Sequence, residues 1–127
     1  MNTTKRTEIS SLGEFGLIDH ITKEIKTDNK ESIKGIGDDA AVLQFSNDEE
    51  VLVSTDLLME GVHFLRKESS PEDIGWKAAA VNLSDIAAMG GSPVATFLSI
   101  ALPKDAQGEW AERFIKGYAE ISNLFDV

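Results

Sequence analysis

The sequence contains no cysteine, and this absence removes several kinds of site at once. Disulfide bonds, thiolate metal centres and a cysteine nucleophile are excluded, while a reducing compartment is permitted without being required. The first ten residues, MNTTKRTEIS, also lack the apolar run of a secretory signal peptide. We therefore expect no secretory signal in this stretch.

Basic residues are scarce, because 12 Lys and Arg stand against 22 Asp and Glu and give a formal net charge of −10. Such a charge repels phosphates, so neither nucleic acid nor an anionic membrane is expected as a partner. The sequence also has no Gly-x-x-x-x-Gly-Lys-Ser/Thr motif and no Gly-x-Gly-x-x-Gly motif. A phosphorylated ligand would therefore need metal ions between its phosphates and the protein.

What the sequence does contain predicts one globular domain with an α/β fold. Its 127 residues and 42% hydrophobic content suffice for a single core. Apolar positions at helical spacing predict a helix over 13–26. Short apolar runs predict a hairpin of 41–45 with 51–56. The long apolar stretch over 78–102 is interrupted by polar residues, glycines and a proline, so it predicts a buried helix and then a strand over 94–102, not a membrane span.

Two further helices have clear sequence signals. Ser70 and Asp73 form a capping-box pattern around Pro71, and this helix is expected to run to about residue 89. Asp105 is expected to cap the last helix. The first of these helices has an apolar stripe of Trp76, Ala79, Ala80, Leu83 and Ala87, and the second has one of Trp110, Phe114, Tyr118, Ile121 and Phe125, both predicted to face the core.

The polar triplet Ser54, Thr55 and Asp56 directly follows the apolar run 51–53. Two hydroxyls and a carboxylate at the end of a buried strand are costly to desolvate without a partner. A hard cation would be such a partner. The triplet is therefore a candidate metal-binding segment.

Two other acidic stretches are candidates for the same site. Asp38 and Asp39 lie among small residues in GIGDDAAVL, which lets the backbone approach a ligand, although Gly and Asp are also ordinary turn residues. Asp85, with Asn82 one turn earlier, is the lone carboxylate in a nearly apolar part of a helix, and the basic residue of that helix, Lys77, lies on another face. A buried Asp85 needs a cation, unless it caps or hydrogen-bonds a neighbouring loop.

These three stretches would form one site if the hairpin strands pair and the second helix packs across their ends. Hydroxyl and carboxylate oxygens without thiols or clustered imidazoles select hard cations such as Mg²⁺. Several such ions side by side imply a ligand with negative charge of its own, for which a nucleotide polyphosphate is the common case.

Five ordered sequence blocks resemble the N-terminal domain of the bacterial thiamine-monophosphate kinase family. This family belongs to the aminoimidazole ribonucleotide synthetase-like superfamily, whose members use ATP. The resemblance implies a mixed β-sheet packed with helices, whose strands form a barrel across a homodimer. The blocks are GEFGLI (13–18), GIGDDAAVL (35–43), STDLLMEGVHF (54–64), AVNLSDIAAMG (80–90) and ATFLSIALP (95–103).

The resemblance also implies an activity, namely transfer of the γ-phosphoryl group of ATP to thiamine phosphate at a site with several Mg²⁺ ions, in a cytoplasmic enzyme. It implies no catalytic side chain, because the transfer is metal-assisted, and His63 would contact thiamine phosphate. Asp38 and Asn82 are expected to shape the site or to lie behind its ligands. The residues that match the family's Mg²⁺ ligands are Asp39, Ser54, Thr55, Asp56 and Asp85.

The chain departs from the family pattern where it ends at Val127. The family continues into a Gly-Gly-Asp-Thr segment and a C-terminal domain, and its active-site cleft lies between the two domains. We therefore expect 1–127 to be the N-terminal ATP- and Mg²⁺-binding domain, inactive by itself. Two alternatives stay open, namely another ATP-dependent enzyme of the superfamily and a non-catalytic dimerising or metal-binding module.

Overall fold

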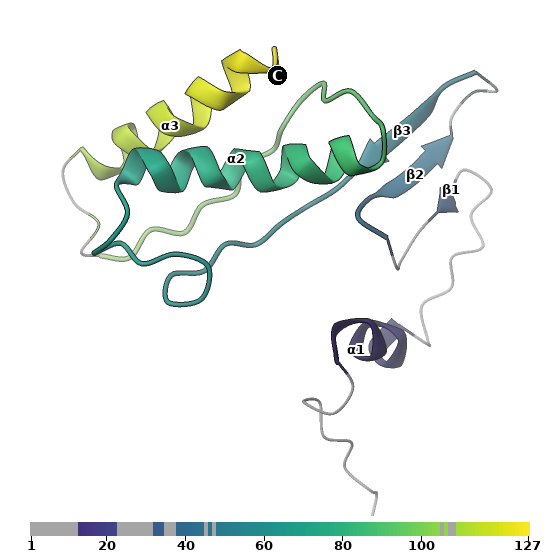
Figure 1. The fold of residues 1–127 in the computed structure, drawn as a ribbon, viewed down its shortest axis with the longest axis horizontal. Helices are drawn as coiled ribbons and strands as arrows, with labels where there is room; N and C mark the ends of the chain where they lie inside the picture. The colour runs from purple at the N-terminus through teal and green to yellow at the C-terminus, as the bar shows by residue number, and fades with distance from the viewer. Residues whose placement is uncertain are drawn as a thin grey trace, which may run out of the picture.

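The chain folds into three helices and a three-stranded sheet within the part that the structure describes. This computed structural model describes residues 13–22, 32–34, 38–44, 46, 48–104, 106 and 109–127. The predicted α/β class is confirmed. In chain order the elements are helix α1 (Gly13–Thr22), strands β1 (Ser32–Lys34), β2 (Ala41–Gln44) and β3 (Glu50–Val53), and helices α2 (Pro71–Ala88) and α3 (Trp110–Leu124) (Figure 1).

The sheet has the order β1-β2-β3, and both pairs of neighbouring strands are antiparallel. Val42 lies opposite Leu52, and Leu43 lies opposite Val51, so the predicted hairpin is confirmed for 41–44 with 50–53. Residues 54–56, predicted to continue the second strand, are not part of it. Strand β3 ends at Val53, and the chain continues beyond the sheet as an extended segment alongside α2 (Figure 1). The polar triplet 54–56 therefore leaves the sheet edge and reaches the helix.

Helix α2 begins as its sequence predicts. The backbone N–H of Asp73 donates to the Ser70 hydroxyl at 3.1 Å, and the Asp73 carboxylate accepts from the Ser70 backbone N–H at 3.3 Å. This reciprocal pair satisfies two N–H groups that a helix start otherwise leaves unpaired. After Ala88 the chain reverses at Gly90, whose φ of 73° lies in the left-handed region that favours glycine.

The core lies between α2 and α3, which lie side by side in Figure 1. Ala79, Leu83 and Ile121 form its buried centre. Near the start of both helices the backbones approach closely, because a methyl group on Gly75 would overlap the Phe114 carbonyl. The helix pair is thus a tightly packed unit. None of the helices in the described residues is long and apolar enough to cross a bilayer.

The predicted strand over 94–102 is wrong. In the structure this stretch is extended but pairs with no described strand, and it runs back along α2 toward the start of α3 (Figure 1). Extended chain becomes a strand only beside another strand's hydrogen-bonding edge. Its side chains remain open to solvent, with Val94 85% and Phe97 99% exposed.

Three smaller expectations change as well. Trp76, Ala87 and Phe125, all predicted as core, are exposed, because α2 and α3 bury narrower stripes against each other than their sequences suggest. The first helix is described as Gly13–Thr22, and positions 23–26 of the prediction lie outside the described residues. The proposed cap Asp105 also lies outside them, and Glu109 occupies the N-cap of α3 without a side-chain cap bond.

Candidate functional site

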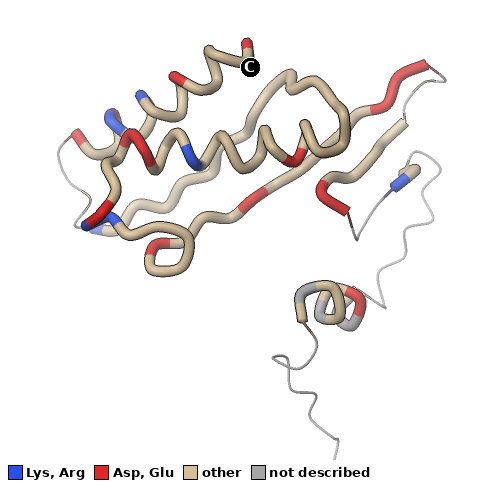
Figure 2. Tube along the Cα trace, in the orientation of Figure 1, with Lys and Arg blue, Asp and Glu red and all other residues tan. Residues whose placement is uncertain are grey.

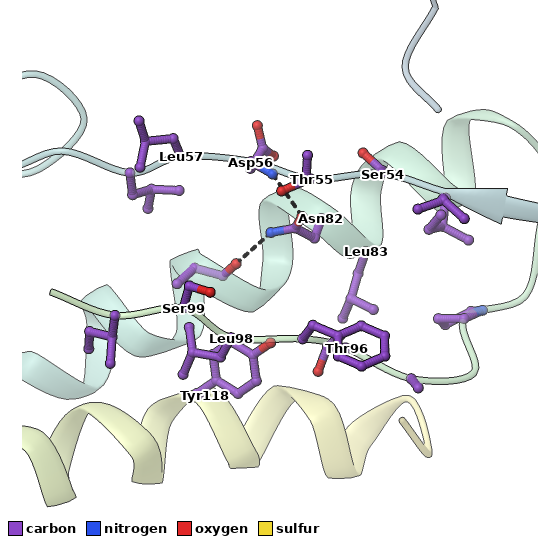
Figure 3. Close-up of a pocket in the computed structure, with 18 of the residues that line it drawn as sticks. Ser54, Thr55, Asp56, Leu57, Asn82, Leu83, Thr96, Leu98, Ser99 and Tyr118 are labelled. Atoms are coloured by element: carbon purple, nitrogen blue, oxygen red, sulfur yellow. Dashed lines mark hydrogen bonds between the residues drawn. The ribbon is translucent and has the colours of Figure 1, made fainter. Parts of the chain in front are cut away.

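The extended segment after β3 carries the polar triplet along α2. The backbone N–H of Asp56 donates to Asn82 Oδ1 at 3.1 Å, and Asn82 Nδ2 donates to the Ala78 carbonyl at 3.0 Å. Figure 3 shows this chain of hydrogen bonds from the extended segment to the helix. Asn82 therefore anchors the segment that holds Ser54, Thr55 and Asp56.

Ser54 connects the three predicted stretches. Its hydroxyl lies 2.6 Å from Asp85 Oδ2 on α2 and 3.0 Å from the backbone carbonyl oxygen of Asp39. A hydroxyl has one proton to donate, and the shorter, charge-assisted bond to the carboxylate is the stronger of the two. The sequence left two possibilities for Asp85, a cation or a hydrogen bond to a neighbouring segment. The structure shows the hydrogen bond, and the segment is the polar triplet itself.

Figure 2 shows that the charged residues of the extended segment 54–60 and of the second half of α2 are acidic. Among them, the Asp56 carboxyl group has a raised pKa. Desolvation raises its pKa above the ordinary value, the negative charge of Asp85 raises it further, and the imidazole of His63 lowers it. Asp56 is exposed as a whole residue, so its carboxylate is only partly withdrawn from water. Two carboxylates that disfavour each other's charge form a site that a cation would stabilise.

Asp38 and Asp39 contribute differently from each other. Asp38 accepts a hydrogen bond from the backbone N–H of Asp39 at 2.9 Å and forms an ion pair with Lys34. These contacts support the interpretation that Asp38 shapes the turn. Asp39 reaches Ser54 with its backbone carbonyl.

The predicted gathering of the Asp39, Asp56 and Asp85 carboxylates is not seen in the part of the chain that the structure describes. Among the described residues, no three His, Asp or Glu side chains lie close enough together to hold a metal ion. What the structure does bring together is the hydroxyl of Ser54, the carboxylate of Asp85, the carbonyl of Asp39 and, through electrostatic coupling, Asp56. All of these donors are oxygens.

His63 lies in the loop between the polar triplet and α2. The backbone N–H of Met59 donates to His63 Nδ1 at 2.9 Å, and Lys77 Nζ on α2 donates to the His63 carbonyl at 2.5 Å. An ion pair between Arg66 and Glu60 at 2.6 Å closes the same loop. The charge of His63 also lowers the pKa of Asp56, against the larger effects of desolvation and Asp85.

A large groove opens beside these residues. Its volume is about 1510 Å³, and it lies between the extended segment 51–60, helix α2 and the segment 92–103. Figure 3 shows Thr96 and Ser99 on one border and Ser54 to Leu57 on the other. Tyr118 of α3 also lines the groove, and its side chain packs against the core between α2 and α3, as predicted. Its place in the apolar stripe predicts the core contact, but no sequence signal indicates that the residue also borders a groove.

Comparison with known protein families shows which family this chain resembles. Residues 37–127 match the family described as AIR synthase related protein, N-terminal domain. The chain belongs to this family. The matched residues include every predicted site residue from Asp38 to Asp85, and the N-terminal-domain fold expected from the resemblance is confirmed.

Several relatives of this AIR synthase-related chain share one name. It is 43% identical over 114 residues to the thiamine-monophosphate kinase of Buchnera aphidicola subsp. Acyrthosiphon pisum, covering 90% of this chain and 35% of the relative. It is 45% identical over 117 residues to the thiamine-monophosphate kinase of Aquifex aeolicus, covering 92% and 36%.

A solved structure is similar to this chain in both fold and sequence. The structure of AaThiL complexed with AMPPCP and TMP superimposes with a TM-score of 0.80 at 40% identity, covering 97% of this chain and 37% of that one. The chain therefore spans little more than a third of the length of the relatives it matches.

Proposed function

We propose that residues 1–127 are the N-terminal ATP- and Mg²⁺-binding domain of a cytoplasmic thiamine-monophosphate kinase. The complete enzyme would transfer the γ-phosphoryl group of ATP directly to thiamine phosphate and release thiamine diphosphate and ADP. The observation that carries this proposal is the match over 97% of the chain to a structure that holds an ATP analogue together with TMP.

The donor set of the site fits Mg²⁺. Serine and threonine hydroxyls, aspartate carboxylates and a backbone carbonyl are hard oxygen donors, and no thiol competes with them. The mutual repulsion of Asp56 and Asp85 gives a physical reason for a cation at this position. The residues proposed to hold the ions are Asp39, Ser54, Thr55, Asp56 and Asp85.

When bound, the ions would neutralise phosphate charge and hold the two phosphate groups in line, which is where most catalysis of phosphoryl transfer arises. The protein itself has little proton chemistry to perform. The second pKa of a phosphate monoester is about 6, so the acceptor oxygen is already anionic near pH 7 and needs no general base. His63 is proposed to contact the thiamine phosphate.

Exposed apolar residues on the sheet and along the groove indicate surfaces that other parts of the enzyme could cover. Val51, Val53 and Leu57 along β3 and its extension are at least 44% exposed, an arrangement typical of surfaces that another domain or subunit covers. We propose that a second copy pairs with the sheet to form a homodimer. We also propose that the remaining two thirds of the kinase covers the groove.

The proposal is tested by joining this chain to the remaining part of the Aquifex aeolicus relative and assaying ATP-dependent phosphorylation of thiamine phosphate. Asp85→Asn is expected to lower kcat at least about 100-fold, in the range for loss of one group that stabilises charge in a transition state. Asp48→Asn removes an exposed carboxylate from the β2–β3 turn and serves as the matched control. Near-normal activity of Asp85→Asn would refute the site assignment.

The two alternatives predict different outcomes. Another ATP-dependent enzyme of the superfamily would leave thiamine phosphate untouched and phosphorylate or activate a different acceptor in a substrate panel. A non-catalytic module would show no Mg²⁺-dependent binding of AMPPCP by calorimetry. Mg²⁺-dependent binding that is lost in Asp85→Asn and kept in Asp48→Asn would exclude the second alternative.

A further inference from the structure

The loop that carries His63 is held at defined points. Between the polar triplet and α2, the backbone N–H of Gly61 donates to the Phe64 carbonyl at 2.8 Å, and that of His63 donates to the Met59 carbonyl at 2.9 Å. Gly61 has a φ of 81°, a conformation that favours glycine. These bonds form a tight turn with His63 close to its tip.

The hydrogen bond to the His63 ring fixes its tautomer. Because Nδ1 accepts a hydrogen bond from the Met59 N–H, Nδ1 carries no proton in the neutral ring. The proton therefore lies on Nε2, and His63 presents an N–H donor on that side. An N–H donor suits an anionic oxygen such as that of a phosphate group.

Lys77 connects this turn to the helix of the acidic site. Its ammonium group donates to the His63 carbonyl at 2.5 Å, and its helix α2 also carries Asn82 and Asp85. A charged donor makes this bond stronger than one between neutral groups. One helix therefore holds both the backbone of His63 and the segment with Asp56.

We propose that Lys77 is a positioning residue for substrate binding. By holding the His63 carbonyl, Lys77 fixes the loop so that Nε2–H of His63 donates to the phosphate of the acceptor substrate beside Asp56. This inference rests on the proposed kinase function and adds a residue that touches neither substrate. A lysine in the middle of a helix is ordinarily a solvated surface residue, whereas Lys77 is proposed to hold the His63 carbonyl in place.

The test uses the same full-length chimera and compares Lys77→Met, Lys77→Arg and Lys67→Met. Lys67 lies in the loop but shows no hydrogen bond or ion pair to a described residue, so Lys67→Met removes the same charge without the carbonyl contact. Lys77→Met is expected to raise the KM for thiamine phosphate about 10-fold and to leave kcat within about 2-fold, as loss of uniform binding does. Lys77→Arg is expected to restore the KM to within about 3-fold of the parent, since it keeps a charged donor.

A spectroscopic readout separates positioning from a general loss of stability. The ¹⁵N spectrum of His63 in the parent is expected to show an unprotonated Nδ1 and a protonated Nε2. In Lys77→Met it is expected to shift toward a mixture of tautomers, while circular dichroism stays unchanged.

Failure of this inference differs from failure of the proposed function. A parent chimera that folds but lacks kinase activity would overturn the proposed function. An active parent in which Lys77→Met matches Lys67→Met, with unchanged KM and an unchanged His63 spectrum, would overturn the role of Lys77 and leave the kinase assignment standing. An equal fall of kcat and kcat/KM in Lys77→Met would overturn it as well, because positioning of ground-state binding predicts a KM effect.

Discussion

The α2–α3 pair and the groove beside it differ in how they hold their residues. In the helix pair, Ala79 is fully buried, and Phe114 and Ile121 are about 5% exposed or less. Along the groove, Phe97 is 99% and Leu57 72% exposed. The helix pair is therefore stabilised by its own apolar burial, whereas the segments around the groove gain little from theirs.

The difference shows what positions the candidate site. The extended segment is attached to α2 by hydrogen bonds, from Ser54 to Asp85 and from the Asp56 backbone to Asn82. Such bonds each contribute on the order of 1 kcal/mol, less than a well-buried large side chain. The packed helix thus supplies a rigid support, and the site is built on its polar edge, where ligands and partner surfaces are free to approach.

The largest expected effect comes from truncating one side chain in each region. Leu83→Ala, in the core of the helix pair, is expected to lower the free energy of unfolding by about 2–4 kcal/mol, because it leaves a cavity. Phe97→Ala removes a larger side chain, yet it is expected to change stability by less than about 0.5 kcal/mol, because Phe97 contacts mostly solvent. Urea titration of the two variants measures both values.

If Leu83→Ala and Phe97→Ala lose the same stability, the contrast between the helix pair and the groove is wrong, because Phe97 must then be covered in solution. Size-exclusion chromatography then tells whether a second copy provides the cover. If the stability of the parent rises with protein concentration and that of Phe97→Ala does so less, self-association buries this segment.

A smaller effect is expected from Asp56→Asn without metal ions. The pKa of Asp56 is raised by desolvation and by Asp85, so its ionised form costs stability in the folded state. Stability of the parent therefore falls as pH rises through the raised pKa, and the cost is absent below the ordinary aspartate pKa of about 3.9. Asp56→Asn should stabilise the chain at pH 7 by about 0.5 kcal/mol, a small value because solvent screens an exposed carboxylate.

Thermal unfolding in a chelator measures this gain, and Asp48→Asn is the control for loss of an exposed charge. The gain should disappear near pH 3. Adding Mg²⁺ should reverse the order of the two proteins, because only the parent retains the carboxylate. A parent that is more stable than Asp56→Asn in the chelator would contradict the repulsion between Asp56 and Asp85.

Local signals in the sequence predicted much of the fold and part of the site. Ser70 and Asp73 predict the start of α2 because a capping box involves residues three positions apart. The hairpin of β2 with β3 follows from two short apolar runs joined by a polar turn. The grouping of Ser54 with Asp85 followed from the hairpin and the helix together, and the hydrogen bond between them agrees with it.

Contacts between distant segments were not predictable in the same way. The stretch 94–102 has the composition of a strand, but whether it pairs depends on an edge that another segment must offer. The sequence places Lys77 on another face of its helix from Asp85 and indicates no partner for it, because its contact with the His63 carbonyl depends on the path of an intervening loop. Sequence spacing gives no information on such a path.

The smallest expected effect concerns the ion pair that joins the two helices outside the core. Arg113 Nε and Nη2 donate to the two carboxylate oxygens of Glu72, each at 2.8 Å. The hydrogen bond from Arg113 is the largest cause that lowers the pKa of Glu72. The pair therefore stabilises the fold above the ordinary glutamate pKa, and this contribution is lost as pH falls through the lowered pKa.

Arg113→Met should therefore lower the melting temperature slightly at pH 7 and have no effect at a pH below that lowered pKa. Arg113→Lys should recover only part of the loss, since an ammonium group lacks the two-pronged geometry. If the melting temperature of Arg113→Met stays below that of the parent by the same amount at low pH, the ion pair is not the cause. The aliphatic part of Arg113 would then pack against the helix pair. In that case apolar burial would stabilise the helix pair out to its surface, and the comparison with the groove would have to include this residue.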